Sequence, residues 1–482
     1  MTPELQLIQG GAQARPTLAL VPPTGRVRLG MRKYLRLKRS QDIVETLAWA
    51  TVVAVVAMFL ADGAIAKITD WASGLNALSR LTALVGTDLL LIHMLLIARV
   101  PWIDKLYGHD RATIAHKKLG KPILYLVIAH FAASLAQFAI LDSKNVVDEF
   151  FSLITLTNDL LLSFFSLALM IFVVISSIKI ARKKLSYEAW YIIHLTSYAS
   201  VLLAIPHQFS TGSDIAGKPL QTAFWLVLYL FVALNLVWYR FLAPFVHSYR
   251  YGLRVGSVVR ESSDTSSIYV TGERLSRLGG KAGQFYLLRV MTPKQWWRPH
   301  PFSISAAPND SYVRFSVGVR GDDTAQLQHL KPGTRIVLEG PYGVFTEDRR
   351  TREKVVLIAA GIGAPPIRAL AESLAARPGD VTIIYRCRNA EDAPLMSELQ
   401  EIARRRGFQL HVLAGGRAHG QSWMPAHLAD IPDHARLSNM APWISESDVY
   451  ICGPSAWTKT VERSLERAGT PKNQIHAEEF AW

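Results

Sequence analysis

The apolar positions follow two different patterns along the chain. The first half carries six long apolar segments, and the second half alternates short apolar runs with polar turns. A helix needs about 20 apolar residues to span lipid. The six segments are near that length and lack polar faces, which argues against buried helices of a soluble core. They cover residues 43–64, 82–100, 121–141, 159–178, 187–207 and 221–242.

The shorter runs after residue 248 predict two further domains. Six strand patterns between 252 and 341, separated by Gly, Pro, Asn and Asp turns, predict a small antiparallel β-barrel. From 354 onward strands alternate with helices, the order of a parallel sheet covered by helices. We therefore expect a multidomain membrane protein with a basic tail at 1–40, a six-helix transmembrane bundle at 41–247, an antiparallel barrel at 248–350 and an α/β parallel-sheet domain at 351–482.

Composition supports a membrane protein. The chain of 482 residues is 50% hydrophobic and its mean hydropathy is positive, which excludes an ordinary soluble globular protein. The first apolar segment starts too late and is too long for a cleavable signal peptide. Two cysteines, Cys387 and Cys452, exclude a disulfide framework and any zinc or iron–sulfur site built from cysteine.

The net charge of +15 would by itself indicate nucleic acid or an anionic membrane surface. The basic residues, however, concentrate in segments that alternate with the apolar spans, near 26–39, 99–121, 179–184 and 240–250. Basic loops stay in the cytoplasm, so we expect a multi-pass protein of the plasma membrane with both termini inside. The topology accounts for the charge, and no nucleic acid is expected.

The apolar spans and the segments between them, residues 43–242, contain six histidines, four of which form two pairs. His116 and His130 are 14 residues apart around the third span, and His194 and His207 are 13 apart on the fifth. Each spacing corresponds to about 20 Å along a helix. Both spans run outward, so His116 should lie level with His194 and His130 level with His207. Two opposed imidazoles can hold one haem iron, so the pairs His116/His194 and His130/His207 predict two stacked b-type haems.

Some details of this half remain open in the sequence. A straight helix would leave the rings of His194 and His207 about 140° apart, so we expect a bend, with Pro206 as its cause. His93 has no matching partner and is expected to be a packing residue. Asp88 either relays protons or bonds a neighbouring helix. The chain has no Cys-x-x-Cys-His sequence, which excludes covalent haem attachment.

Six spans with these histidine pairs, followed by a flavin and nicotinamide module, resemble the ferric reductase and NADPH oxidase superfamily. The resemblance covers residues 44–482. It implies a six-helix transmembrane haem bundle, a cytoplasmic antiparallel β-barrel FAD domain and an α/β parallel-sheet NAD(P) domain. Members that reduce oxygen can carry a further histidine one turn beyond the outer ligand of the third span, where this chain has Ser134. No EF-hand loop is present, so calcium regulation is not expected.

The run RPHPFSIS at 298–305 resembles the flavin signature of the ferredoxin–NADP reductase group. FAD needs a cation for its pyrophosphate, an aromatic face for its ring and a hydroxyl near its reactive nitrogen. The resemblance places His300 at the pyrophosphate, Phe302 against the ring and Ser303 at that nitrogen. A second run at 321–327 presents a hydroxyl and backbone N–H groups to phosphate. The predicted FAD-binding residues are His300, Pro301, Phe302, Ser303, Ser305 and Thr324.

The run GIGAPP at 361–366 directly follows an apolar strand and opens a helix. Glycines at this place let a pyrophosphate approach the backbone at a helix N-terminus. CGP at 452–454 ends a later strand, which the resemblance places beside the nicotinamide. The predicted nucleotide-binding residues are Gly361, Gly363, Pro366, Gly453 and Pro454.

Three arginines follow the next two strands and would favour NADPH over NADH by binding the 2′-phosphate. They are Arg386, Arg388 and Arg417, and each is alternatively an ordinary surface arginine. The tail IHAEEFAW at 475–482 resembles C-terminal ends in which an aromatic covers the flavin, with Phe480 expected in that place and Trp482 as the alternative. Ser303, Cys452 and Phe480 are the predicted catalytic residues.

These modules predict an NAD(P)H-dependent transmembrane oxidoreductase with FAD and two haems b. Electrons would pass from NADPH or NADH on the cytoplasmic side through FAD and both haems to a small external acceptor. A ferric iron or ferric chelate acceptor is favoured, because Ser134 stands where an oxygen-handling histidine is expected. The alternative is an NADPH oxidase that reduces oxygen to superoxide. A quinone or a periplasmic protein is a less favoured acceptor than either iron or oxygen. No obligatory protein partner is expected.

Two other classes compete with this prediction. A redox-sensing or proton-conducting membrane protein with an appended reductase would favour a span with arginine at every third position, and none of the six spans has one. A flavin reductase that uses the spans only as an anchor would not need paired histidines. A haem spectrum separates both classes from the main prediction.

Overall fold

The computed structural model describes residues 31–178, 182, 184–293, 295–418 and 422–479. The chain forms two compact units, one of residues Leu37–Leu242 and one that contains Ala243–Trp482. Residues 1–30 of the predicted basic tail lie outside the described residues. The predicted aromatic cover, Phe480 or Trp482, also lies outside them.

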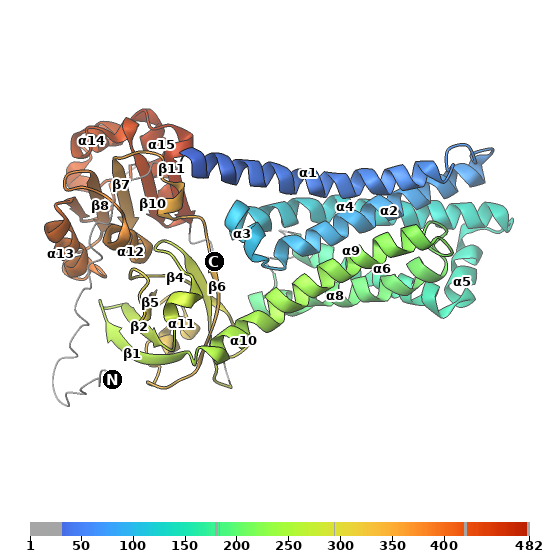
Figure 1. Ribbon diagram of the computed structural model, residues 1–482, viewed down its shortest axis with the longest axis horizontal. Helices are drawn as coiled ribbons and strands as arrows, with labels where there is room; N and C mark the ends of the chain where they lie inside the picture. The colour runs from blue at the N-terminus through green and yellow to red at the C-terminus, as the bar shows by residue number, and fades with distance from the viewer. Residues whose placement is uncertain (1–30, 179–181, 183, 294, 419–421, 480–482) are drawn as a thin grey trace. The chain divides into compact units, whose positions relative to one another are not determined.

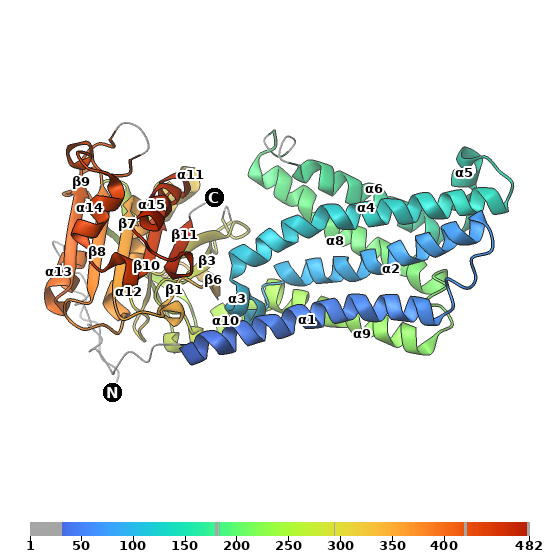
Figure 2. The same cartoon turned by 90° about the horizontal axis from the view of Figure 1, so that it is seen from above.

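Six helices of the described residues are long and apolar enough to cross a membrane, as the sequence predicts. They are α1 (Met31–Ala61), α2 (Trp71–Ile97), α4 (His109–Leu141), α6 (Asn158–Ser177), α8 (Tyr187–Ser210) and α9 (Pro219–Asn235), the last continued by the π-helix Leu236–Leu242 and α10 (Ala243–Arg250). Two shorter helices, α3 (Pro101–Tyr107) and α5 (Val146–Leu156), connect them. Within this unit α2 and α4 lie side by side along their length (Figure 1 and Figure 2).

Helix α2 begins earlier than the apolar segment that predicts it. The side chain of Asp70 accepts a hydrogen bond from the N–H of Ser73 at 2.8 Å, and the Ser73 hydroxyl accepts one from the N–H of Asp70 at 3.0 Å. This reciprocal capping box starts the helix at Trp71. The added turns contain Ser79 and Arg80, whose polar side chains kept this stretch out of the predicted span.

Helix α8 continues through Pro206 to Ser210, so the proline does not end it. The structure thus places His194 and His207 on one helix, as the sequence predicts.

All six strands predicted for the first domain after the membrane unit are present, as two three-stranded antiparallel sheets. The first sheet has the order β1-β2-β5 and the second β4-β3-β6. Val270, Leu288 and Phe315 are fully buried in the core that the two sheets share. The strands are β1 (Arg254–Arg260), β2 (Thr265–Thr271), β3 (Phe285–Val290), β4 (His300–Ser303), β5 (Val313–Gly318) and β6 (Ile336–Tyr342).

Among the described residues these strands form two antiparallel sheets, and no continuous ladder closes them into the predicted barrel. Isolated bridges join Arg254 to Arg335 and Ile304 to Phe315. Strand β4 has only four residues and contains Pro301, which lacks the N–H that a longer ladder requires.

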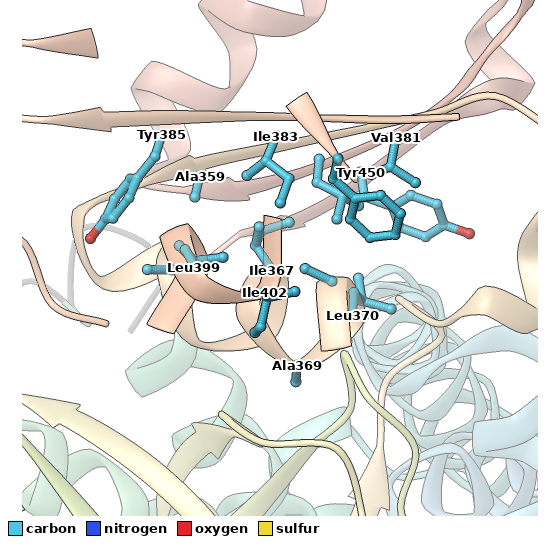
Figure 3. Packing of buried hydrophobic residues seen from close by; sticks show 14 of the residues in the cluster. Ala359, Ile367, Ala369, Leu370, Val381, Ile383, Tyr385, Leu399, Ile402 and Tyr450 are labelled. Atoms are coloured by element: carbon cyan, nitrogen blue, oxygen red, sulfur yellow. The ribbon is translucent and has the colours of Figure 1, made fainter. Parts of the chain in front are cut away.

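The last domain is the predicted α/β unit, with a five-stranded parallel sheet in the order β11-β10-β7-β8-β9. Figure 3 shows Ile367 and Leu370 of α12 and Leu399 of α13 packing against one face of this sheet. The order reverses between β7 and β10, the place where open α/β sheets bind nucleotides. The elements are β7 (Val355–Ala360), α12 (Ala364–Ser373), β8 (Val381–Cys387), α13 (Met396–Arg406), β9 (Gln409–Ala414), α14 (Asp433–Met440), β10 (Asp448–Gly453), α15 (Ser455–Arg467) and β11 (Ile475–Glu479).

A buried charge network fixes the antiparallel sheets to the α/β domain. Arg314 of β5 donates to both carboxylate oxygens of Glu398 on α13, at 2.8 and 3.0 Å. Arg368 of α12 reaches the same carboxylate at 2.7 Å and also pairs with Glu372. Both arginine side chains are at most 3% exposed, so neither has water as an alternative partner.

Replacing Glu398 with Ala is expected to destabilise this unit by about 3–5 kcal/mol, because Arg314 would keep a buried charge without its carboxylate. Pulse proteolysis of the full chain over a urea series measures the change. The matched control is Glu401→Ala on the same helix, whose carboxylate forms exposed ion pairs with Arg404 and Arg405 and contributes little. Equal unfolding midpoints for the two variants would contradict a structural role for the network.

Candidate functional site

The structure brings His116 of α4 and His194 of α8 together. Their ring centroids lie 6.1 Å apart, with ring planes at 75°. A metal–imidazole bond is about 2 Å long, so two imidazoles on one ion have ring centroids about 6 Å apart. The separation of this donor pair, drawn from two different candidate spans, is compatible with two imidazoles that would hold one metal ion.

The surroundings of this pair hold both rings in place. Nδ1 of His116 lies 3.2 Å from the carbonyl oxygen of His93, and the two rings stack with centroids 3.6 Å apart. Nδ1 of His194 lies 3.4 Å from the hydroxyl of Ser177, and the ring stacks on Trp190 at 5.0 Å. His93 is a packing residue, as predicted, and its backbone also serves His116, which the sequence did not indicate.

The second predicted pair is not joined by a ring contact in the described part of the chain. His130 lies further along α4, where its Nδ1 is 3.0 Å from the carbonyl oxygen and 2.9 Å from the hydroxyl of Ser79. The hydroxyl of Ser134 bonds the same Ser79 hydroxyl. Ser134, the position at which an oxygen-handling histidine is expected, thus belongs to the hydrogen-bond network of His130.

Strand β4 carries the predicted flavin residues. His300 and Phe302 are two positions apart, so their side chains share one face, and their rings stack at 6.1 Å. Nε2 of His300 and the hydroxyl of Ser303 are buried and find no hydrogen-bond partner among the described residues. Buried polar groups are normally bonded, so these two atoms fit a polar ligand such as FAD. Burial lowers the pKa of His300, so its imidazole is neutral and offers a hydrogen bond rather than a charge.

Two predicted flavin residues are already used by the protein itself. The Ser305 hydroxyl accepts a bond from Nε of Arg314 at 3.0 Å, within the buried charge network. The Thr324 hydroxyl accepts from the N–H of Arg320 at 2.8 Å and closes the turn before α11 (Asp322–Leu327). Pro301 stands opposite Leu287 in the ladder of β3 and β4. The hydrogen bonds give Ser305 and Thr324 structural roles.

The predicted nucleotide motifs meet at the carboxyl edge of β7 and β10. Gly361 has φ +51°, a left-handed conformation that favours glycine. A Cβ at Gly363 would collide with the carbonyl oxygen of Cys452 and crowd the N–H of Gly453. Glycine is therefore required for this turn to lie against the end of β10, while Pro366 is buried in the first turn of α12. A pyrophosphate fits such a turn, because the backbone is open at Gly361.

The thiol of Cys452 is fully buried, and burial raises its pKa well above the ordinary value. It is therefore a neutral packing group of the sheet rather than a nucleophile. Cys452 pairs with Glu478 of β11, a buried carboxylate that the sequence reasoning missed. A Cβ at Gly343, just after β6, would lie 3.8 Å from Glu478 Oε1. The C-terminal strand thus reaches the antiparallel sheets. The sequence feature that marks it is the pair of glutamates just before Phe480.

The three predicted phosphate-binding arginines differ in environment. Nη1 of Arg386 donates to the carbonyl oxygens of Cys387 and Leu413, and Nε donates to that of Trp423. This guanidinium is therefore occupied by backbone. Arg388 and Arg417, which follow β8 and β9, are exposed.

Three regions of the chain match known families. Residues 82–205 match the family described as "Ferric reductase like transmembrane component". Residues 257–346 match "FAD-binding domain", and residues 357–463 match "Oxidoreductase NAD-binding domain".

Two curated relatives resemble the second half of the chain. The "3-ketosteroid-9-alpha-monooxygenase, ferredoxin reductase component" of Mycolicibacterium smegmatis is 29% identical over 47% of this chain and 65% of its own length. The "Flavohemoprotein" of Vibrio cholerae serotype O1 is 30% identical over 46% of this chain and 58% of its own length. The chain thus spans less than two thirds of the length of these curated relatives.

One similar solved structure is the flavohem-like FAD/NAD binding domain of nitric oxide dioxygenase from Vibrio cholerae. The match covers 47% of this chain and 97% of the chain in that structure, with 24% identity and a TM-score of 0.39. The three family matches carry the assignment because they follow one another in a single order, from the transmembrane component through the FAD-binding to the NAD-binding domain. This chain therefore has the architecture of the ferric reductase and NADPH oxidase superfamily.

Proposed function

We propose that the protein moves electrons from NAD(P)H through FAD and two b-type haems to a small acceptor across the membrane. The observation that carries this proposal is the approach of His116 and His194, whose ring centroids lie 6.1 Å apart although they belong to different candidate spans. Paired imidazoles in apolar helices are expensive unless they serve a ligand. Their pairing supports an electron-transferring rather than an anchoring role for this unit.

When bound, FAD takes two electrons from a nicotinamide and gives them up singly, as one-electron haem carriers require. The chain's own residues bind and orient these groups. The bond from Nδ1 of His116 to a carbonyl fixes the proton on Nδ1 and leaves the Nε2 lone pair free for iron. We propose that His194 also binds iron through Nε2, as do His130 and His207 at the second level, although Nδ1 of His207 is buried and has no hydrogen-bond partner among the described residues.

At the other end, we propose that Phe302 stacks on the flavin ring, that His300 donates a hydrogen bond to the FAD pyrophosphate and that Ser303 donates one at the reactive flavin nitrogen. Their buried, unbonded Nε2 and Oγ atoms support this assignment. The two antiparallel sheets would then act as halves of one flavin barrel, within a domain at 248–350. The glycine turn at 361–363 would hold the nucleotide pyrophosphate, and Phe480 would cover the flavin until the nicotinamide displaces it.

We further propose that the protein lies in the plasma membrane and that both termini lie in the cytoplasm. The basic segments that alternate with the spans support this orientation. Ferric iron or a ferric chelate is the proposed acceptor. Position 134 carries serine, whose hydroxyl bonds Ser79, and not the histidine expected in a member that reduces oxygen.

Removing a proposed ligand should remove one haem. We expect His116→Ala and His130→Ala each to lose about half of the haem absorbance, while NAD(P)H-dependent reduction of FAD survives. His109→Ala, on the same helix and next to Asp104, is the control and should keep both haems. Reduced-minus-oxidised spectra of the purified proteins measure the haem content, and two intact haems in both ligand variants would refute the assignment.

The exposed arginines should set the nucleotide preference. We expect Arg388→Ala and Arg417→Ala each to raise the KM for NADPH about 10-fold, as for one lost charged hydrogen bond. The KM for NADH should change little, because NADH lacks the 2′-phosphate. Steady-state kinetics with both nucleotides test this, with exposed Arg404→Ala on α13 as control. Equal effects on the two nucleotides would argue against 2′-phosphate binding.

The acceptor is tested with the protein in sealed vesicles and NADPH on the side of the FAD module. With ferric citrate on the opposite side, we expect ferrous iron to form. The amount formed should be the same when superoxide dismutase is added. Loss of most of the signal on addition of the dismutase would instead identify oxygen as the acceptor, with superoxide as the product.

A further inference from the structure

Both proposed ligands on α4 give their second ring nitrogen to the backbone of α2. Nδ1 of His116 lies 3.2 Å from the carbonyl oxygen of His93, and Nδ1 of His130 lies 3.0 Å from that of Ser79. A carbonyl oxygen only accepts hydrogen bonds, so each imidazole carries its proton on Nδ1. The lone pair of Nε2 is thereby left for a metal.

The spacing of the two carbonyls equals the spacing of the two imidazoles. Ser79 and His93 are 14 residues apart on α2, as His116 and His130 are on α4. Fourteen residues make almost four helical turns, so both members of each set lie near one face. The helices run antiparallel, with the later residue of α2 meeting the earlier residue of α4. One helix pair therefore supports both levels.

Glycines keep the two helices close between these bonds. Gly86 lies midway between Ser79 and His93, and a Cβ there would be 3.3 Å from Cβ of Leu126 on α4. Gly120 of α4 also faces α2, with a Cβ position in ordinary contact with a ring carbon of His93 at 3.7 Å. Small residues allow helix backbones to approach in a membrane. A larger side chain at Gly86 would push α2 away from α4 and lengthen both Nδ1 bonds.

We infer that α2 is the positioning helix of the haem unit: it sets the tautomer and the donor strength of His116 and His130 through the carbonyls of His93 and Ser79. This inference rests on the proposed function, in which both histidines bind haem iron. A strong acceptor at Nδ1 makes the imidazole a better donor, which stabilises the ferric state and lowers the reduction potential. Gly86 acts on both levels, because it controls the distance between the helices.

The hydroxyl of Ser79 adds a contribution at one level only. It lies 2.9 Å from Nδ1 of His130 and bonds the hydroxyl of Ser134, so it is a second acceptor for the same N–H. Its removal leaves the carbonyl in place. A substitution at Gly86 should therefore affect both levels, whereas removal of the Ser79 hydroxyl should affect only the level of His130.

The test is a spectroelectrochemical titration of the purified, haem-loaded full chain. Gly86→Val is expected to raise both midpoint potentials and to change the low-spin signals in electron paramagnetic resonance. Ser79→Ala should raise only the potential of the haem that His130→Ala removes, and Ser79→Thr should restore it. The matched control is Gly74→Val on α2, where a Cβ would meet only a methyl group of Ile68, at 3.8 Å. That variant should leave both potentials unchanged.

Unshifted potentials in Gly86→Val and Ser79→Ala, with two haems bound, would overturn the inference while leaving the proposed function intact. If Gly86→Val fails to assemble, the Ser79→Ala and Ser79→Thr pair decides, because Ala removes only the hydroxyl and Thr retains it. A starting protein that binds no haem would instead refute the proposed function.

Discussion

Inside a membrane, an imidazole that offers one nitrogen to a metal must give its other N–H to the protein, because no water is present to accept it. This constraint accounts for the packing of α2 against α4. The carbonyl oxygens of Ser79 and His93 receive the N–H groups of His130 and His116, and Gly86 allows the necessary approach. The pair His116 and His194 then lies at the distance that one iron requires.

The extramembrane unit meets a similar constraint with charges. Arg314, Arg368 and Glu398 are withdrawn from water, so none of them can move away without leaving a buried charge. Arg314 comes from a strand of the antiparallel sheets, and Arg368 and Glu398 come from two helices of the α/β domain. The network therefore holds the proposed flavin residues of β4 in a fixed relation to the glycine turn and to the end of β10. Hydride transfer between a nicotinamide and a flavin requires such fixed geometry.

The outcome for individual site residues follows from what else each side chain can bond. Ser303 and His300 keep free polar atoms and remain available for a cofactor, whereas Ser305, Thr324 and Arg386 are engaged by Arg314, a turn and three backbone carbonyls. Residue type and order do not distinguish these two groups. Arg386 and Arg388 are two positions apart on the chain, yet only the second is exposed.

The sequence by itself determined the six spans, the change from antiparallel strands to alternating strands and helices in the later domains, and the spacing of the histidines along two helices, because hydropathy, periodicity and spacing are local properties. It did not determine the start of α2, which depends on the Asp70 cap, nor the division of the next six strands into two three-stranded sheets, which depends on pairing between distant segments. Only the tertiary structure decided which groups meet: Glu478 beside Cys452, and the carbonyls of α2 beside the imidazoles of α4. A backbone carbonyl has no sequence signature, since every residue carries one, and its role is set by the neighbouring helix.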